Sequence, residues 1–149
     1  MNISRMGCAG VALVAALTAG CASVPMAAPD KDAEAKQFRV PPGKSRIYVY
    51  RNESMGGAIK IVITLDGKVV GSTAPQTYFA LDVAPGKHEV GCIVENTGSL
   101  SVKAPAGKPV FVWQEVKMGA WSPRCALNLV DDETGRDGVM GSGLAEANP

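Results

Sequence analysis

Short runs of alternating apolar and polar residues occupy the chain from Ser45 onward, and turn-forming residues interrupt them about every 8–12 positions. Alternation with a period of two places every second side chain on the same face of a strand. The predicted strands are Arg46–Arg51, Ala58–Leu65, Lys68–Thr73, Thr77–Val83, Lys87–Glu95, Ser99–Lys103, Pro109–Met118 and Cys125–Asp131. This pattern predicts an all-β fold, and we expect an antiparallel β-sandwich of about 7–8 strands.

The apolar faces of these strands indicate where the core lies. Ile61 and Ile63 share one face of their strand, and the alternation also places Cys92 and Cys125 on apolar faces. Asp66-Gly67 stands between two apolar runs, which predicts a two-residue hairpin because glycine adopts the positive φ that such a turn needs.

The first 20 residues follow a different pattern. One cation, Arg5, precedes an uncharged run of small and apolar residues from Gly7 to Gly20. At about 14 residues the run is too short to span ~30 Å of hydrocarbon, and it is typical of the apolar region of a secretory signal. The run ends in Leu17-Thr18-Ala19-Gly20-Cys21, which resembles the lipobox of bacterial lipoproteins, with Thr18 at the place where leucine is usual.

The lipobox resemblance implies that Cys21 accepts a diacylglyceryl group and becomes the first residue of the mature chain. Lipoproteins of this kind carry two or three acyl chains, and stable membrane attachment needs more than one. Ala22 rather than aspartate follows the cysteine, which by analogy with enteric bacteria favours the outer membrane, facing the periplasm. Cys8 is too early to be the anchor. The alternative is an ordinary cleaved signal, with cleavage near Ala22 or beyond.

The length of 149 residues suits one domain. Residues 22–43 are rich in alanine and proline, and no apolar stripe marks them as a helix that packs on a core. We therefore divide the chain into a signal peptide (1–20), the acylated cysteine with a flexible tether (21–44), the β-sandwich (45–137) and a flexible tail (138–149).

Charge argues against one class of partner. The chain has 15 basic and 14 acidic residues, and removal of Arg5 with the signal leaves 14 of each. A neutral chain has no basic surface to offset phosphates, so we expect no nucleic-acid partner.

Three stretches carry a resemblance to a known family: Val40–Asn52, Asp66–His88 and Phe111–Lys117. Together they are similar to a family of small bacterial lipoproteins, the domain-of-unknown-function family 2846, over about Val40 to Asp137. The second stretch also looks like the PEGA type of surface β-sandwich repeat. The resemblance implies an Ig-like or transthyretin-like sandwich, and it supplies neither an activity nor catalytic residues.

The remaining cysteines allow two interpretations. Once Cys21 is acylated, Cys92 and Cys125 are the thiols left for pairing, and an oxidising envelope favours a disulfide between them if the strand order brings them together. Otherwise they pack separately as small apolar residues. We expect no metal site, because two cysteines without CxxC spacing and one histidine cannot complete a tetrahedral ligand set.

The sequence contains few residues that could form a catalytic site. His88, the one histidine, would need an activated nucleophile and a carboxylate beside it to act in a triad. The nucleophile-elbow pattern GxSxG does not occur, and Gly141-Ser142-Gly143 lies in the predicted tail. No phosphate-binding GxxxxGK[ST] loop occurs either, so we predict no catalytic residues and no cofactor.

Aromatic residues near predicted strand ends offer a binding surface. The aromatic candidates are Tyr48, Tyr50, Trp113 and Trp121, since exposed rings stack on sugars or anchor protein partners. Asn52 is a candidate because it begins the predicted loop Asn52–Gly57, and sandwiches carry recognition on their end loops. The alternative is that the rings complete the core or cover its edge.

The leading functional hypothesis is a non-enzymatic binding or assembly module of the cell envelope. It would be tethered to the membrane by lipid on Cys21 and would contact an envelope protein or glycan. Two alternatives stay open: a hydrolase acting on envelope material with His88 as a base, and a purely structural periplasmic domain.

Overall fold

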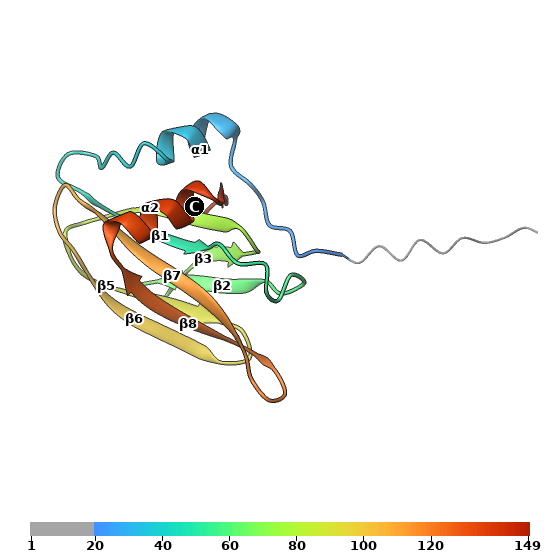
Figure 1. Cartoon of the computed structure of the whole chain (residues 1–149). Coiled ribbons are helices and arrows are strands. Elements are labelled where there is room, and N and C mark those ends of the chain that lie inside the picture. Colours follow the sequence, from blue (N-terminus) through green and yellow to red (C-terminus); the bar gives the residue numbers. More distant parts are fainter. Residues whose placement is uncertain (1–19) are drawn as a thin grey trace, which may run out of the picture.

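Two β-sheets stacked face to face form the centre of the computed structural model, which describes residues 20–149 (Figure 1). One sheet has the strand order β8-β7-β1-β4-β9 and the other has the order β3-β2-β5-β6. The strands are β1 (Ser45–Arg51), β2 (Ile61–Leu65), β3 (Lys68–Thr73), β4 (Thr77–Val83), β5 (Gly86–Ile93), β6 (Thr97–Ala104), β7 (Pro109–Met118), β8 (Pro123–Val130) and β9 (Gly143–Leu144). The predicted β-sandwich is confirmed.

Most neighbouring strands are antiparallel, and two pairs are not. β1 pairs with β7 in parallel, with Tyr50 opposite Trp113, and the short β9 pairs in parallel with β4. The five-stranded sheet is therefore mixed. Because β1 and β7 run in the same direction, the loops that follow them leave from the same end of the sandwich.

The predicted hairpin at Asp66-Gly67 joins β2 to β3. Both residues have positive φ, 50° for Asp66 and 80° for Gly67, as a type I′ turn requires. Leu65 and Lys68 pair directly across this turn, so the two-residue loop sets the register of the hairpin.

Apolar side chains from both sheets meet between them. The buried members of this inner core are Ile47, Val49, Ile61, Ile63, Val70, Phe79, Leu81, Val83, Val90, Cys92, Val102, Ala104, Val112, Val116, Cys125 and Ala145. Period-two alternation placed Ile61, Ile63, Cys92 and Cys125 on apolar faces, and all four are members of this core. Leu129, which alternates with Cys125 on β8, is instead 59% exposed.

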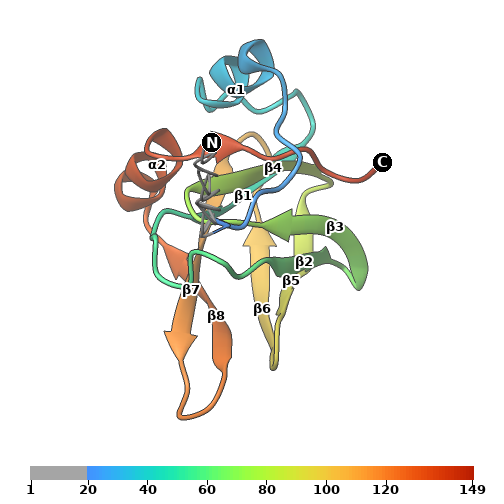
Figure 2. The same cartoon turned by 90° about the vertical axis from the view of Figure 1, so that its right-hand side faces the viewer.

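A second core covers the outer face of the five-stranded sheet. Helices α1 (Pro29–Ala35) and α2 (Asp132–Met140) lie over that face in both views (Figures 1 and 2). The buried residues of this outer core are Ala35, Tyr48, Tyr50, Tyr78, Phe111 and Val139. No helix in residues 20–149 is long and apolar enough to cross a bilayer.

Helix α2 approaches the sheet closely because it carries two glycines. A Cβ on Gly135 would lie 2.1 Å from Phe111 Cγ, and one on Gly138 would lie 2.1 Å from Tyr50 Cε2. Asp131 caps the helix by accepting a hydrogen bond from the Thr134 N–H at 2.9 Å. The absence of a side chain at these two positions therefore allows the helix to pack against the sheet.

The structure differs from the predicted flexible tether at residues 21–44 and the predicted flexible tail at 138–149. Within the first segment α1 begins with proline at its first turn and buries Ala35 against the sheet. Within the second, β9 extends the sheet, and Met26 pairs with Ala145 to join the two segments. Both segments pack through a few small residues and backbone hydrogen bonds, which produce no periodic apolar pattern. The predicted signal peptide lies, apart from Gly20, outside the described residues.

Candidate functional site

Cys21, the predicted lipidation residue, lies at the edge of the folded domain. Its thiol is free and exposed. The next residue, Ala22, donates its backbone N–H to the Gly57 carbonyl at 2.8 Å. This bond holds the start of the described chain beside the β1–β2 loop (residues 52–60), so the chain joins the sandwich immediately after Cys21.

The β7–β8 turn (residues 119–122) lies at the same end of the sandwich. β1 and β7 are parallel neighbours, so the loops after Arg51 and Met118 leave from one edge of the sheet. Glu53 in the β1–β2 loop accepts a hydrogen bond from the Val116 N–H of β7. We call the surface formed by Cys21, the β1–β2 loop and the β7–β8 turn the Cys21 end.

A buried arginine fixes the shape of the β1–β2 loop. The Arg51 side chain is fully buried and donates to the carbonyls of Met55, Gly56 and Ile59 at 2.8–3.0 Å. Burial lowers the pKa of Arg51, and the nearby Glu53 carboxylate opposes that effect. Because three carbonyls converge on one planar cation, the loop is held in a single arrangement beside Cys21. Sequence patterns did not indicate this role, since Arg51 ends a strand as many exposed arginines do.

Cys92 on β5 and Cys125 on β8 form a disulfide that links the two sheets, with their Cα atoms 6.3 Å apart. Both cysteines are buried, and the Asn96 side chain bonds the backbone N–H and C=O of Cys125. The sequence left the pairing open because strand order decides it. Disulfides persist in oxidising compartments and are rare in the cytosol.

The five residues of the predicted binding surface do not share one surface. Tyr48 and Tyr50 are buried, with 0% and 2% exposure, so these two candidates do not belong to an exposed binding surface. Trp113 is half-buried, whereas Asn52 is exposed and Trp121 is 98% exposed. Both exposed residues lie at the Cys21 end.

Tyr48 and Tyr50 are buried because helices α1 and α2 cover their face of the sheet. The Tyr48 hydroxyl donates to the Ala35 carbonyl at 2.7 Å, and its ring stacks on Phe111 with centroids 5.1 Å apart. Burial raises the pKa of both tyrosine hydroxyls. These rings therefore act in packing, as the alternative interpretation stated.

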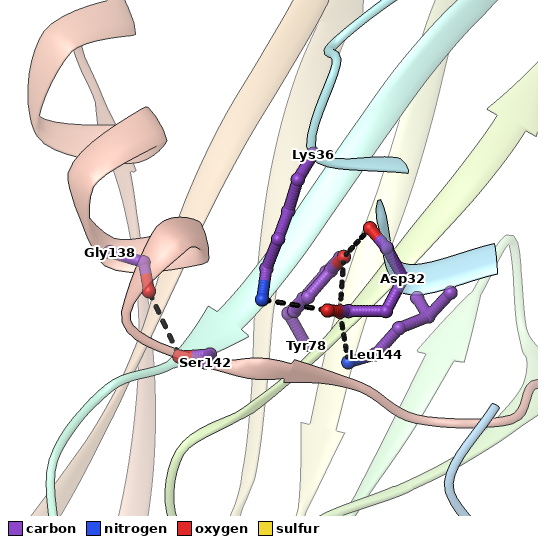
Figure 3. A network of polar contacts seen from close by, with 6 residues as sticks. All are labelled: Asp32, Lys36, Tyr78, Gly138, Ser142 and Leu144. Carbon is purple, nitrogen blue, oxygen red and sulfur yellow. Dashed lines mark hydrogen bonds and ion pairs between the residues drawn. The ribbon is translucent and has the colours of Figure 1, made fainter. Parts of the chain in front are cut away.

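A polar network attaches α1 to the sheet (Figure 3). One carboxylate oxygen of Asp32 accepts from the Tyr78 hydroxyl and the Leu144 N–H, both at 2.9 Å. The other accepts from Lys36 Nζ at 2.8 Å. Burial alone would raise the pKa of Asp32, but the hydrogen bonds from Lys36, Tyr78 and Leu144 outweigh it and lower that pKa. In the same view, Ser142 donates to the Gly138 carbonyl and closes the end of α2.

His88 is engaged at both ring nitrogens. Nδ1 lies 2.7 Å from Asp66 Oδ2, and Nε2 lies 2.7 Å from the Ala84 carbonyl oxygen. The bond with Asp66 and the bond with the Ala84 carbonyl raise the pKa of His88, while that of Asp66 is lowered. A general base needs a free ring nitrogen that faces the substrate. This geometry instead stabilises the turn before β5, which is a structural role.

Comparison with known proteins places the chain in a family. A family model described as "Protein of unknown function (DUF2846)" matches residues 41–125, which are 85 of the 149 residues. The chain belongs to the DUF2846 family. A relative of this DUF2846 protein from Haemophilus influenzae, described as an "Uncharacterized protein", is 34% identical over 144 residues, or 95% of this chain and 84% of the relative. No solved structure matches the chain.

The DUF2846 match coincides with much of the sandwich. It runs through β1 to β7 and includes both disulfide cysteines, whereas α1, α2 and β9 lie outside it. Similarity to the Haemophilus influenzae protein extends further, since it covers nearly the whole chain. The family part of the predicted resemblance is thereby confirmed.

Proposed function

We propose that this DUF2846 protein is a lipoprotein of the bacterial cell envelope, anchored through Cys21 and acting without catalysis as a binding or assembly module. Its partner would be an envelope protein or glycan, and its membrane would be the outer membrane, facing the periplasm. The resemblance of Asp66–His88 to PEGA surface modules belongs to the same proposal.

The position of Cys21 is the observation that carries the proposal. The residue follows a lipobox-like sequence and has an exposed, free thiol at the edge of the domain. The Cys92–Cys125 disulfide supports export, because such bonds persist outside the reducing cytosol.

The geometry of His88 favours a non-enzymatic role over the hydrolase alternative. Both ring nitrogens are engaged, one by a carboxylate and one by a backbone carbonyl. A nucleophile would need a free histidine nitrogen within hydrogen-bonding reach to lose its proton. Leu129, which is 59% exposed at the end of β8 away from the β7–β8 turn, favours a contact surface over an inert structural domain.

Metabolic labelling tests the anchor. Cells expressing the wild-type chain, Cys21→Ser or Cys8→Ser are grown with labelled palmitate, and the protein is isolated from membranes. We expect label in the wild type and in Cys8→Ser, and none in Cys21→Ser. Cys8→Ser is the matched control because Cys8 lies within the predicted signal peptide. Equal labelling of all three chains, or of none, would refute the anchor.

Site-directed photo-cross-linking in cells tests the binding role. Leu129, which is 59% exposed near the end of β8, carries the cross-linker, and the exposed Glu133 on α2 serves as a polar control position. A binding module predicts a discrete adduct of constant mass from Leu129 that is lost when Cys21 is serine. Absence of discrete adducts from Leu129 and from other exposed apolar positions would contradict it.

A further inference from the structure

Large apolar side chains are exposed at the Cys21 end. Met55 is 53% exposed in the β1–β2 loop, Met118 is 62% exposed at the end of β7, and Trp121 is 98% exposed in the β7–β8 turn. A tryptophan that makes almost no contact with its own domain is costly to leave in water, so its position indicates contact with something outside the domain.

Two cationic residues, Lys117 and Arg124, lie on the strands next to the turn that carries Trp121. Lys117 and Arg124 are opposite each other in the β7–β8 register, one pair before Met118 and Pro123 at the turn, and both are exposed. Glu115, which lies 3.5 Å from Lys117 Nζ, is set further back along the strand. An aromatic tip followed by long cationic side chains matches the bilayer surface, where tryptophan sits at the headgroup level and lysine or arginine reaches the phosphates.

The position of Cys21 indicates which surface these residues face. Ala22 is bonded to Gly57, and a Cβ on Gly56 would lie 3.3 Å from Val116 Cγ1, so the start of the chain, the loop and β7 are in continuous contact. Figures 1 and 2 show the start of the described chain beside the β1–β2 loop, and the β7–β8 turn projecting below them as the lowest part of the molecule in both views.

A residue spans at most about 3.6 Å of extended chain. Since Ala22 is already fixed to the domain, a lipid on Cys21 leaves no tether that would hold this end away from the bilayer. A protein partner at this end would have to fit between the domain and the leaflet that holds its anchor. The bilayer is therefore the occupant that the geometry favours.

We propose that the β7–β8 turn docks in the headgroup layer of a phospholipid leaflet, with Trp121 and Met118 at the level of the upper acyl chains and Lys117 and Arg124 at the phosphates. The proposal rests on the lipoprotein function for the choice of leaflet. It fixes the orientation of the domain, with the Cys21 end on the membrane and the opposite end of the sandwich facing the periplasm.

Tryptophan fluorescence of the full-length chain tests the docking. The native protein is purified in detergent and reconstituted into vesicles of phosphatidylethanolamine and phosphatidylglycerol, with and without brominated phospholipid as a quencher. The chain has two tryptophans, so Trp113→Phe leaves Trp121 as the only emitter. We expect its emission to shift to shorter wavelength on reconstitution and to be lost with brominated lipid.

A second variant covers the case that Trp113→Phe does not fold, because Trp113 is half-buried. Trp121→Phe removes a side chain that is 98% exposed, and the difference between its spectrum and that of the wild type isolates Trp121. A Trp121 signal that remains water-like and unquenched in vesicles overturns the docking proposal. The docking proposal is also overturned if the Trp121 emission shifts in native outer membranes but not in the phospholipid vesicles, because the contact is then with a protein.

Mass spectrometry of the same sample separates the two proposals. If Cys21 carries no lipid but Trp121 is quenched, the anchor fails and the docking stands. If Cys21 is lipidated but Trp121 is not quenched, the anchor stands and the docking fails.

Discussion

Removing the Cys92–Cys125 disulfide will strongly destabilise the sandwich. The bond joins residues 33 positions apart in sequence and ties β5 to β8 across the two sheets. In the chain-entropy model, closing a loop of this length contributes about 4 kcal/mol to the free energy of unfolding. For a domain of this size that corresponds to a fall in Tm of roughly 12 °C. In Cys92→Ala/Cys125→Ala, loss of two buried sulfur atoms adds to the effect.

Denaturant unfolding measured by circular dichroism, with and without reductant, tests this magnitude. We expect reductant to lower the unfolding midpoint of the wild type substantially and to leave that of the double alanine variant unchanged. The variant is thus the control for other effects of the reductant. A fully reduced wild type with the same midpoint as the oxidised protein would refute the reasoning, because the native protein would then derive no stability from the bond.

Two further predictions concern α2 and the β2–β5 contact. Gly138→Ala will lower the free energy of unfolding by about 1–3 kcal/mol, because the added Cβ would overlap the Tyr50 ring. Gly141→Ala is the control and will have little effect, since the atom nearest to its added Cβ is 3.7 Å away. Equal denaturation midpoints for the two variants would contradict the close packing of α2 on the sheet. The His88–Asp66 pair, with the pKa of His88 raised and that of Asp66 lowered, will contribute most between about pH 4 and pH 6.5. Its contribution will fall at higher pH as His88 loses its proton and at lower pH as Asp66 gains one. His88→Gln will flatten this pH dependence of stability by no more than about 1 kcal/mol, since the pair is partly exposed, and an unchanged profile would show that the pair is not formed.

The strands could be predicted because each carries its own signal. Alternation places Ile61 and Ile63 on one face without reference to any other part of the chain, and Asp66-Gly67 specifies a turn from two residues alone. These local preferences agree with the final fold, so the inner core followed from the pattern.

The pairing of distant elements could not be predicted. The disulfide and the parallel pairing of β1 with β7 depend on strand order, which alternation does not encode. Alternation places Tyr48 and Tyr50 on the face of β1 opposite to the inner core, but it does not show whether that face is exposed to solvent. The helices that cover this face bury both side chains. The sequence allows a turn or two of helix near Asp30–Gln37 and one at Asp132–Arg136, but it does not show that they pack on the sheet, because α2 packs through Gly135 and Gly138, residues that ordinarily indicate a loop.

The packing of residues 22–44 changes the expected arrangement at the membrane. A flexible tether of about 20 residues would leave the domain free within ~25 Å of its anchor. Instead, Ala22 is bonded to Gly57 and α1 is attached to Tyr78 through Asp32. With a lipid on Cys21, as proposed, the domain would be held at the lipid surface, and it could adopt few orientations there.

Mass spectrometry of the protein isolated from bacterial membranes tests the central claim most directly. The account predicts that the chain begins at Cys21, with the mass of a diacylglyceryl group, and in many bacteria a further acyl group, on that residue. A chain that retains residues 1–20 and carries an unmodified thiol at Cys21 would contradict it.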